Sequence, residues 1–104
     1  LEDICAIAHV QEFTPSGLAC DGDLLAITDI RNHVVWVYHL RTHRLGLLAG
    51  APGVHGHQDG QGERARFWLP NAVSVSPDGR GFVVGEARGR RLVTREGEVI
   101  TLAR

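Results

Sequence analysis

The chain of 104 residues contains no lysine, only two cysteines and no long hydrophobic run. A stretch of 18 or more apolar residues, which a membrane-spanning helix needs, does not occur. The first three residues, Leu1, Glu2 and Asp3, include two acids where a signal peptide has basic residues. We therefore expect no membrane partner, and the composition is typical of a soluble globular protein.

Helical periodicity is also missing, because every ten-residue stretch that approaches it is interrupted by glycine or proline. The segment 33–40 instead alternates with period two and is rich in β-branched and aromatic side chains, such as Val34, Trp36 and Tyr38. This pattern is typical of a strand in a sheet that is covered on both faces. The sequence therefore predicts an all-β fold.

The two cysteines, Cys5 and Cys20, are 15 positions apart and lie in apolar surroundings. We expect both to be buried, reduced thiols, because a metal site needs a closer pair of ligands. Reduced cysteines are compatible with a cytoplasmic location, but no compartment is predicted.

A pattern of turn and apolar residues occurs twice. The segment from Phe13 to Gly22 can be paired with the segment from Phe67 to Gly79, which places the two prolines, Pro15 and Pro70, 55 positions apart. The two Asp-Gly pairs are 57 positions apart. A period of this size indicates stacked supersecondary units.

Each copy resembles an NHL repeat, the unit of a family of β-propellers. In the second copy Ala72 replaces Gly17, and Glu86 replaces Asp29. The matching residues of the first copy are Phe13, Pro15, Gly17, Leu18, Asp21, Gly22, Leu24 to Asp29, Arg31 to Val34 and Leu48 to Gly50; in the second copy Gly89 also replaces Asn32, and Arg104 replaces Gly50.

The resemblance implies two four-stranded antiparallel blades of a β-propeller. Residues 1–12 are expected to form the last strand of a preceding blade or a ring-closing strand, 13–50 the first blade, 51–66 a glycine-rich inter-blade loop and 67–104 the second blade. The expected strands are 17–20, 24–28, 33–40 and 45–49, then 72–76, 81–85, 90–94 and 98–103. A propeller needs typically 4 to 8 blades. We therefore expect the remaining blades to come from a longer polypeptide, a larger assembly or self-association.

The turns are expected to depend on glycine. Asp21-Gly22, Asp78-Gly79 and Glu96-Gly97 lie between strands, where hairpins need positive φ. In the family an Asp and an Asn shape the turn between the second and third strands. The second copy has Glu86 and Gly89 instead, so other contacts must hold its turn.

Three side chains of the glycine-rich loop are weak candidates for a metal site, namely His55, His57 and Asp59. Their alternate spacing puts them on one side of an extended segment, and zinc favours imidazole ligands. Solvated loop histidines are the alternative, with Asp59 capping a turn through its side chain. Ala65 and Phe67 are expected to fill the space between the blades.

Basic residues concentrate in the second half of the chain. Residues 1–60 contain three arginines and seven acids, whereas residues 61–104 contain eight arginines and five acids. Arginine suits carboxylates and phosphates, and alternation along the strand sends Arg90 and Arg91 to opposite faces. Solvated arginines are the alternative to a contact surface. The partner-binding candidates are Trp68, Arg66, Arg88, Arg90, Arg91 and Arg95.

These features predict a protein-interaction or scaffolding module within a larger protein. No catalytic set is present, so no enzyme activity and no cofactor are predicted. One alternative is part of a metal- or ligand-binding enzymatic or sensor propeller. The other is an RNA-binding NHL propeller face near 88–95, which the sequence pI of about 6.6 disfavours.

Overall fold

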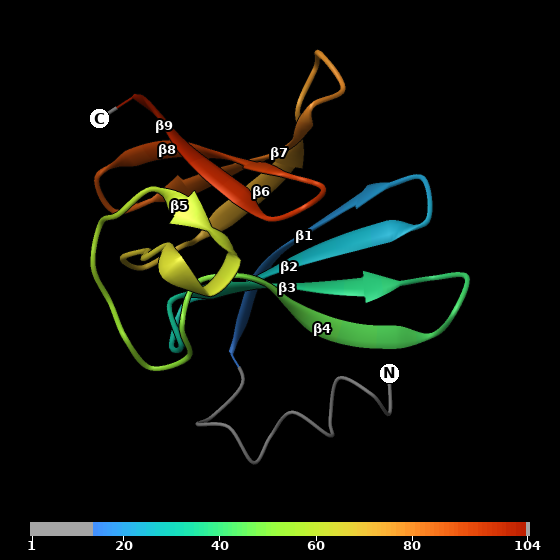
Figure 1. Cartoon of the computed structure of the whole chain (residues 1–104), viewed down its shortest axis with the longest axis horizontal. Helices are drawn as coiled ribbons and strands as arrows, with labels where there is room; N and C mark the ends of the chain where they lie inside the picture. The colour runs from blue at the N-terminus through green and yellow to red at the C-terminus, as the bar shows by residue number, and fades with distance from the viewer. Residues whose placement is uncertain (1–13, 104) are drawn as a thin grey trace.

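The computed structural model describes residues 14–103 and consists of two antiparallel sheets. The predicted strand within residues 1–12, together with Cys5 and Phe13, lies outside the described residues. The first sheet is a meander of four strands in chain order: β1 (Pro15–Asp21), β2 (Leu24–Asp29), β3 (Val34–His39) and β4 (Arg44–Ala49) (Figure 1).

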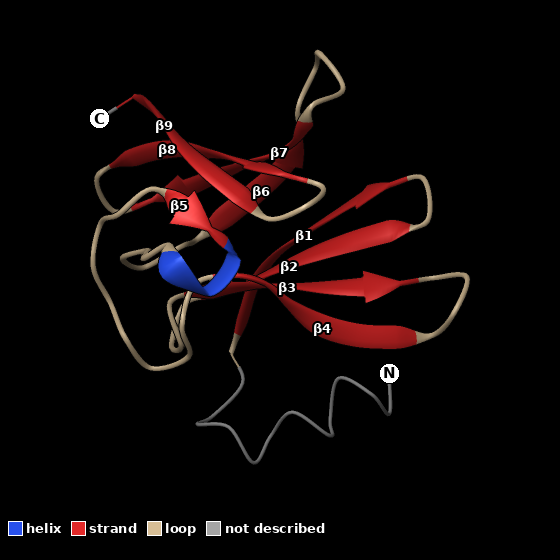
Figure 2. Cartoon of the chain, in the orientation of Figure 1, coloured by secondary structure: helices blue, strands red, loops and turns tan. Residues whose placement is uncertain are grey.

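The second sheet has five strands, whereas four were predicted. Its main strands are β6 (Ala72–Val75), β7 (Gly81–Glu86), β8 (Gly89–Thr94) and β9 (Glu98–Ala103). The extra strand, β5 (Gly60–Gln61), comes from the glycine-rich loop and pairs with β9, because the edge of β9 offers unpaired backbone groups. Between β5 and β6 lies a single 3-10 turn, η2 (Gly62–Arg64) (Figure 2).

The predicted all-β fold is confirmed, and the strand positions agree with the sequence pattern to within about two residues at each end. The hairpin glycines have the expected conformations, because φ is 64° at Gly22, 78° at Gly79 and 94° at Gly97. A left-handed backbone of this kind costs glycine little, since it has no Cβ. None of the helical segments within the described residues has the length and apolar character needed to cross a membrane.

One apolar core joins the two sheets. In the first sheet β3 is buried on both faces, as its sequence predicts, and Val35 and Val37 point into the shared core. Ala65 and Phe67 of the inter-sheet loop are fully buried in the same core, which confirms their expected position. The core residues are Leu24, Ala26, Val35, Val37, Leu48, Ala49, Ala65, Phe67, Phe82, Val84, Val93 and Val99.

The sheets approach each other most closely at their first main strands, β1 and β6. A Cβ placed on Gly17 would lie 3.2 Å from the amide nitrogen of Val73, so only a small residue fits there. Ser16 Oγ donates a hydrogen bond to the carbonyl oxygen of Pro70 at 2.7 Å. At the other end of the contact, Arg95 forms a 2.7 Å ion pair with Asp21.

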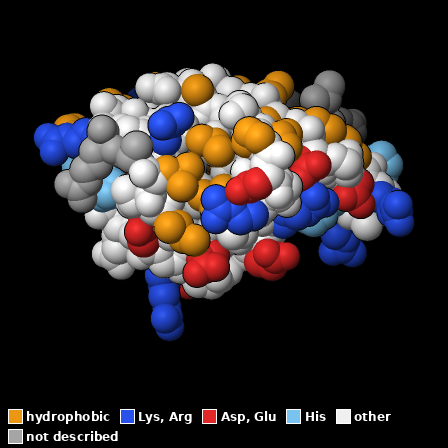
Figure 3. Space-filling view, turned by 90° about the horizontal axis from the view of Figure 1, so that it is seen from above, with side chains coloured by type: hydrophobic (Ala, Val, Ile, Leu, Met, Phe, Trp, Pro, Cys, Tyr) orange, Lys and Arg blue, Asp and Glu red, His pale blue; other side chains and the backbone are white. Residues whose placement is uncertain are grey.

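The flanks that face away from the shared core retain exposed apolar side chains. In the first sheet Leu18 is 61% exposed and Leu47 is 36% exposed. In the second sheet Ile100, which pairs with Leu92, is exposed as well. Viewed from above, hydrophobic side chains gather in patches between charged ones (Figure 3).

Cys20 corrects one expectation, because it is exposed rather than buried. It pairs with Leu25 on the same flank as Leu18, which points away from the shared core. The alternation of β1 therefore places its thiol outside the packed layer.

Gly97 should be intolerant of any side chain. A Cβ at this position would lie 2.6 Å from the carbonyl oxygen of Leu48, and φ is already +94°. We expect Gly97→Ala to lower the free energy of unfolding by roughly 2 kcal/mol in urea denaturation. The matched control is Gly46→Ala, since nothing lies within 4 Å of a Cβ at Gly46; its effect should stay within about 0.5 kcal/mol. Equal effects of the two substitutions would contradict this account of the sheet contact.

Candidate functional site

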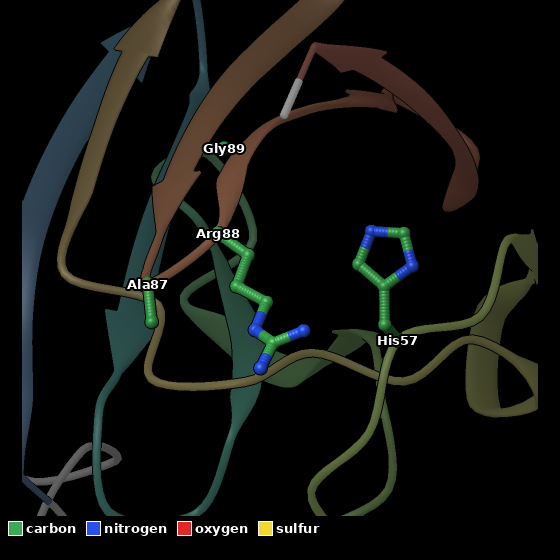
Figure 4. A pocket seen from close by; sticks show the side chains of 4 residues that line it. All are labelled: His57, Ala87, Arg88 and Gly89. Carbon is green, nitrogen blue, oxygen red and sulfur yellow. The ribbon is translucent and has the colours of Figure 1, made fainter.

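A pocket of about 690 Å³ opens where the glycine-rich loop meets the turn between β7 and β8. His57 lines it from the loop, and Ala87, Arg88 and Gly89 line it from the turn. The side chains of His57 and Arg88 extend into the same space from these two segments (Figure 4). The volume lies within the range of small-molecule sites.

Trp68 and Arg88 form the rim beside this pocket. The guanidinium carbon of Arg88 lies 5.0 Å from the centroid of the Trp68 ring, a cation–π geometry. Two imidazole rings lie next to Trp68 in sequence of contact. The ring centroids of Trp68 and His55 are 6.4 Å apart, and those of His55 and His33 are 5.5 Å apart. Trp68 remains 36% exposed, so this rim is accessible to a ligand.

A buried ionic network lies beneath the pocket. Arg91 is fully buried, and its Nη1 donates to Glu86 Oε1 at 2.9 Å and to the carbonyl oxygen of Arg66 at 3.0 Å. Its Nη2 donates to Asp59 Oδ1 at 2.8 Å. The guanidinium also lies over the Phe67 ring, 5.2 Å from its centroid. Arg91 thus connects β8, the end of β7 and the glycine-rich loop.

Glu86 is the anchor of this end of the second sheet. Its side chain is only 1% exposed. Oε2 accepts a 2.9 Å hydrogen bond from the backbone amide of Trp68, while Oε1 lies 3.8 Å from His57 Nε2. Glu86 therefore links the rim, the pocket wall and the buried arginine.

In the first sheet, the corresponding turn between β2 and β3 is stabilised by different contacts. Asp29 accepts hydrogen bonds from the backbone amides of Arg31 and Asn32, both at 3.1 Å. Its Oδ2 also accepts from Asn32 Nδ2 at 2.8 Å and from Trp36 Nε1 at 3.1 Å. In the second sheet Glu86 has the place of Asp29 and pairs with Arg91. The prediction that other contacts hold the second turn is confirmed.

Asp59 does not cap its own turn, which corrects the expectation. It accepts from Thr101 Oγ1 at 2.7 Å and from the amide of Thr101 at 3.1 Å, in addition to Arg91. Burial raises the pKa of Asp59, but the hydrogen bonds from Thr101 and Arg91 outweigh burial and hold this pKa below its usual value. The loop is thereby fastened to β9.

The three weak metal candidates are not brought together. His55 packs between the His33 and Trp68 rings, His57 faces Glu86, and Asp59 binds Arg91 and Thr101. Within residues 14–103, no group of three His, Cys, Asp or Glu side chains is placed to hold a metal ion.

The arginines that were candidates for partner binding also have different surroundings. Arg91 is fully buried, so the expectation of a surface role is wrong for it, because two acids and a carbonyl group occupy its donors. Arg95 pairs with Asp21, and Arg66 donates to backbone oxygens of its own loop. Arg90 is exposed and pairs with Gly85, on the flank opposite Arg91. Arg88 alone among them lines the pocket.

Sequence reasoning missed the buried partner of Glu86, whereas it read His33 as a structural residue of the turn. The departure from Asp29 to Glu86 was visible, but the buried arginine partner was not. His33 adopts φ of 58°, and its Nδ1 accepts a 3.1 Å hydrogen bond from the amide of Leu69. This bond connects the turn after β2 with the segment that enters the second sheet.

Two solved structures share this fold over most of the chain. An auxiliary nutrient binding protein from Bacteroides thetaiotaomicron VPI-5482 matches 90% of this chain, with a TM-score of 0.69 and 22% identity. An auxiliary nutrient binding protein from Bacteroides ovatus ATCC 8483 matches 77% of it, with a TM-score of 0.61 and 25% identity. The chain spans about a quarter of the length of these proteins, 26% and 22% respectively. No family model and no curated protein matches the chain.

The buried arginine should be needed for stability mainly through its charge. We expect Arg91→Met to lower the free energy of unfolding by about 3 kcal/mol, because the buried Glu86 carboxylate would lose its cationic partner. The double variant Arg91→Met with Glu86→Gln should recover part of this loss, since it removes the unpaired charge. Chemical denaturation measures both effects. Arg90→Met, at an exposed neighbour, is the control and should change stability by no more than about 0.5 kcal/mol. Failure of the double variant to recover stability would refute the role of charge.

His33 should make stability fall under mild acid. Burial and the nearby His55 lower the pKa of His33, and Asp29 opposes them only in part. Because the folded state binds the proton less readily, this contribution is present above about pH 6.5 and is lost as the pH falls from there through the lowered pKa of the folded state. Asn tolerates positive φ, so we expect His33→Asn to flatten the dependence of unfolding free energy on pH between about 7.5 and 5.5. Identical slopes in the two proteins would contradict this.

Proposed function

We propose that the chain is a pair of adjacent blades of an NHL-type β-propeller and that it binds a small-molecule ligand, without transforming it, at the Trp68–Arg88 rim. The single observation that carries the binding function is the pocket between the glycine-rich loop and the β7–β8 turn, with Arg88 held over the exposed Trp68 ring. Aromatic and arginine side chains at such a rim are typical of binding sites.

The propeller assignment is supported by the repeat itself. Ile27 and Trp36 of the first copy correspond, at the 57-residue period, to Val84 and Val93 of the second. The second pair packs in the shared core against the first sheet. On the first sheet the same flank has exposed apolar residues next to this pair, since Leu18 pairs with Ile27 and Leu47 pairs with Trp36. A further blade can therefore stack there in the same way.

The comparisons support a binding role. Both similar structures are of auxiliary nutrient binding proteins. Around the pocket, His57 has the nearby Glu86 carboxylate, yet among residues 14–103 no nucleophilic serine or cysteine lines the pocket. A protein partner at the same rim is the second candidate, favoured by the exposure of Trp68 and Leu69.

Ligand binding can be read from the indole signals of the two tryptophans. Trp68 lies at the rim, whereas Trp36 is buried and bonded to Asp29, so it serves as an internal reference. We expect at least one of glucose, maltose, succinate, tryptophan, AMP and trialanine to shift the ¹⁵N–¹H signal of Trp68 Nε1 saturably without shifting that of Trp36.

The matched control for this titration is Trp68→Ala, which should abolish the remaining ligand-induced shifts in residues 86–89. If none of the six compounds moved the Trp68 signal saturably, the small-molecule function would be rejected. If residues 86–89 still showed the same saturable shift in Trp68→Ala, binding at the Trp68–Arg88 rim would be rejected.

A further inference from the structure

We infer that the pocket recognises a small molecule through a single carboxylate group, which would be bound by the guanidinium of Arg88 with His57 opposite. This inference rests on the proposed binding function and adds the ligand class to it.

The polar side chains that line the pocket are both nitrogen groups. Arg88 offers only N–H donors, and His57 offers at least one. The remaining lining residues, Ala87 and Gly89, have no polar side chain. A ligand that enters must therefore present hydrogen-bond acceptors, which a carboxylate supplies in the flat arrangement that a guanidinium fork matches.

Arg88 is available for such a ligand. No acidic side chain of the described residues forms an ion pair with it, whereas Arg80, Arg91 and Arg95 each have an acidic partner. Its position is nevertheless defined, because the guanidinium rests on the Trp68 ring. A positioned but unpaired arginine at the edge of a pocket favours an anion.

The charge beneath the pocket favours one negative charge over two. Glu86 and Asp59 share the single cation Arg91, so this network has a formal charge of −1 when both acids are ionised. Glu86 lies only 3.8 Å from His57, directly behind the pocket wall. A dianionic phosphate would be repelled more strongly by this network than a monocarboxylate, which offsets the stronger attraction of its second charge to Arg88.

The test compares three probes of similar shape on the full chain. Benzoate carries the carboxylate, benzamide is its neutral isostere, and phenyl phosphate carries the dianion. Benzoate should shift the Trp68 indole signal and the Arg88 Nε signal saturably, while benzamide should bind at least tenfold more weakly. Phenyl phosphate should bind no more tightly than benzoate.

Two variants locate the effect. Arg88→Gln should weaken benzoate binding at least tenfold, and its unfolding temperature should match that of the wild type because Arg88 is exposed. Arg90→Gln removes the same charge from the opposite flank two residues away and should bind benzoate like the wild type. Arg88→Lys should bind with intermediate affinity, since it keeps the charge and loses the fork.

Several results would overturn the inference. Equal binding of benzoate and benzamide, unchanged affinity in Arg88→Gln, or tighter binding of phenyl phosphate would each do so. If glucose, maltose or AMP, none of which has a carboxylate, moved the Trp68 signal while benzoate did not, the binding function would be supported and the carboxylate inference would be rejected. If no compound moved that signal, both would fall.

Discussion

The apolar layer between the two sheets is the constraint on which the rest of this structure depends. Neither sheet can bury its inner face alone, and Phe67, from the loop that connects them, completes the layer together with residues such as Val35 and Val84. Close approach at Gly17 and the ionic contact between Arg95 and Asp21 fix how the sheets sit on each other. The pocket forms where the glycine-rich loop meets the β7–β8 turn, and the bonds of Asp59 to Arg91 and Thr101 fasten that loop to the second sheet.

The turn between the second and third main strands is stabilised by different interactions in the two copies of the repeat. In the first, Asp29 binds backbone amides and neutral side-chain donors. In the second, Glu86 binds the amide of Trp68 and a buried guanidinium. A buried charge must be paired, and the pairing with Arg91 brings in Asp59 from a distant loop. Where Asp29 caps its own turn, Glu86 therefore connects the end of β7 with β8 and with the segment that contains Trp68. The rim and the pocket lie next to these contacts.

Much of the fold followed from local patterns, and the site followed much less. Strand positions come from period-two alternation and turn glycines, both of which act over a few residues, so the eight main strands were predictable. The short strand β5 was not, because it depends on a free edge of β9. Trp68 and Arg88 were recognised as candidates by type. Arg91 was misjudged, since alternation puts Arg90 and Arg91 on opposite faces of the strand but does not show which of the two is buried.

The sequence by itself determined the all-β architecture, the paired units and the glycine positions, because these depend on backbone sterics and alternation, which are local. Only the tertiary structure decided that Arg91 is buried between Glu86 and Asp59, that Cys20 is exposed, and that the loop histidines face different partners. These outcomes depend on which surfaces meet across separations of tens of residues. The electrostatic surroundings of each side chain arise from that packing.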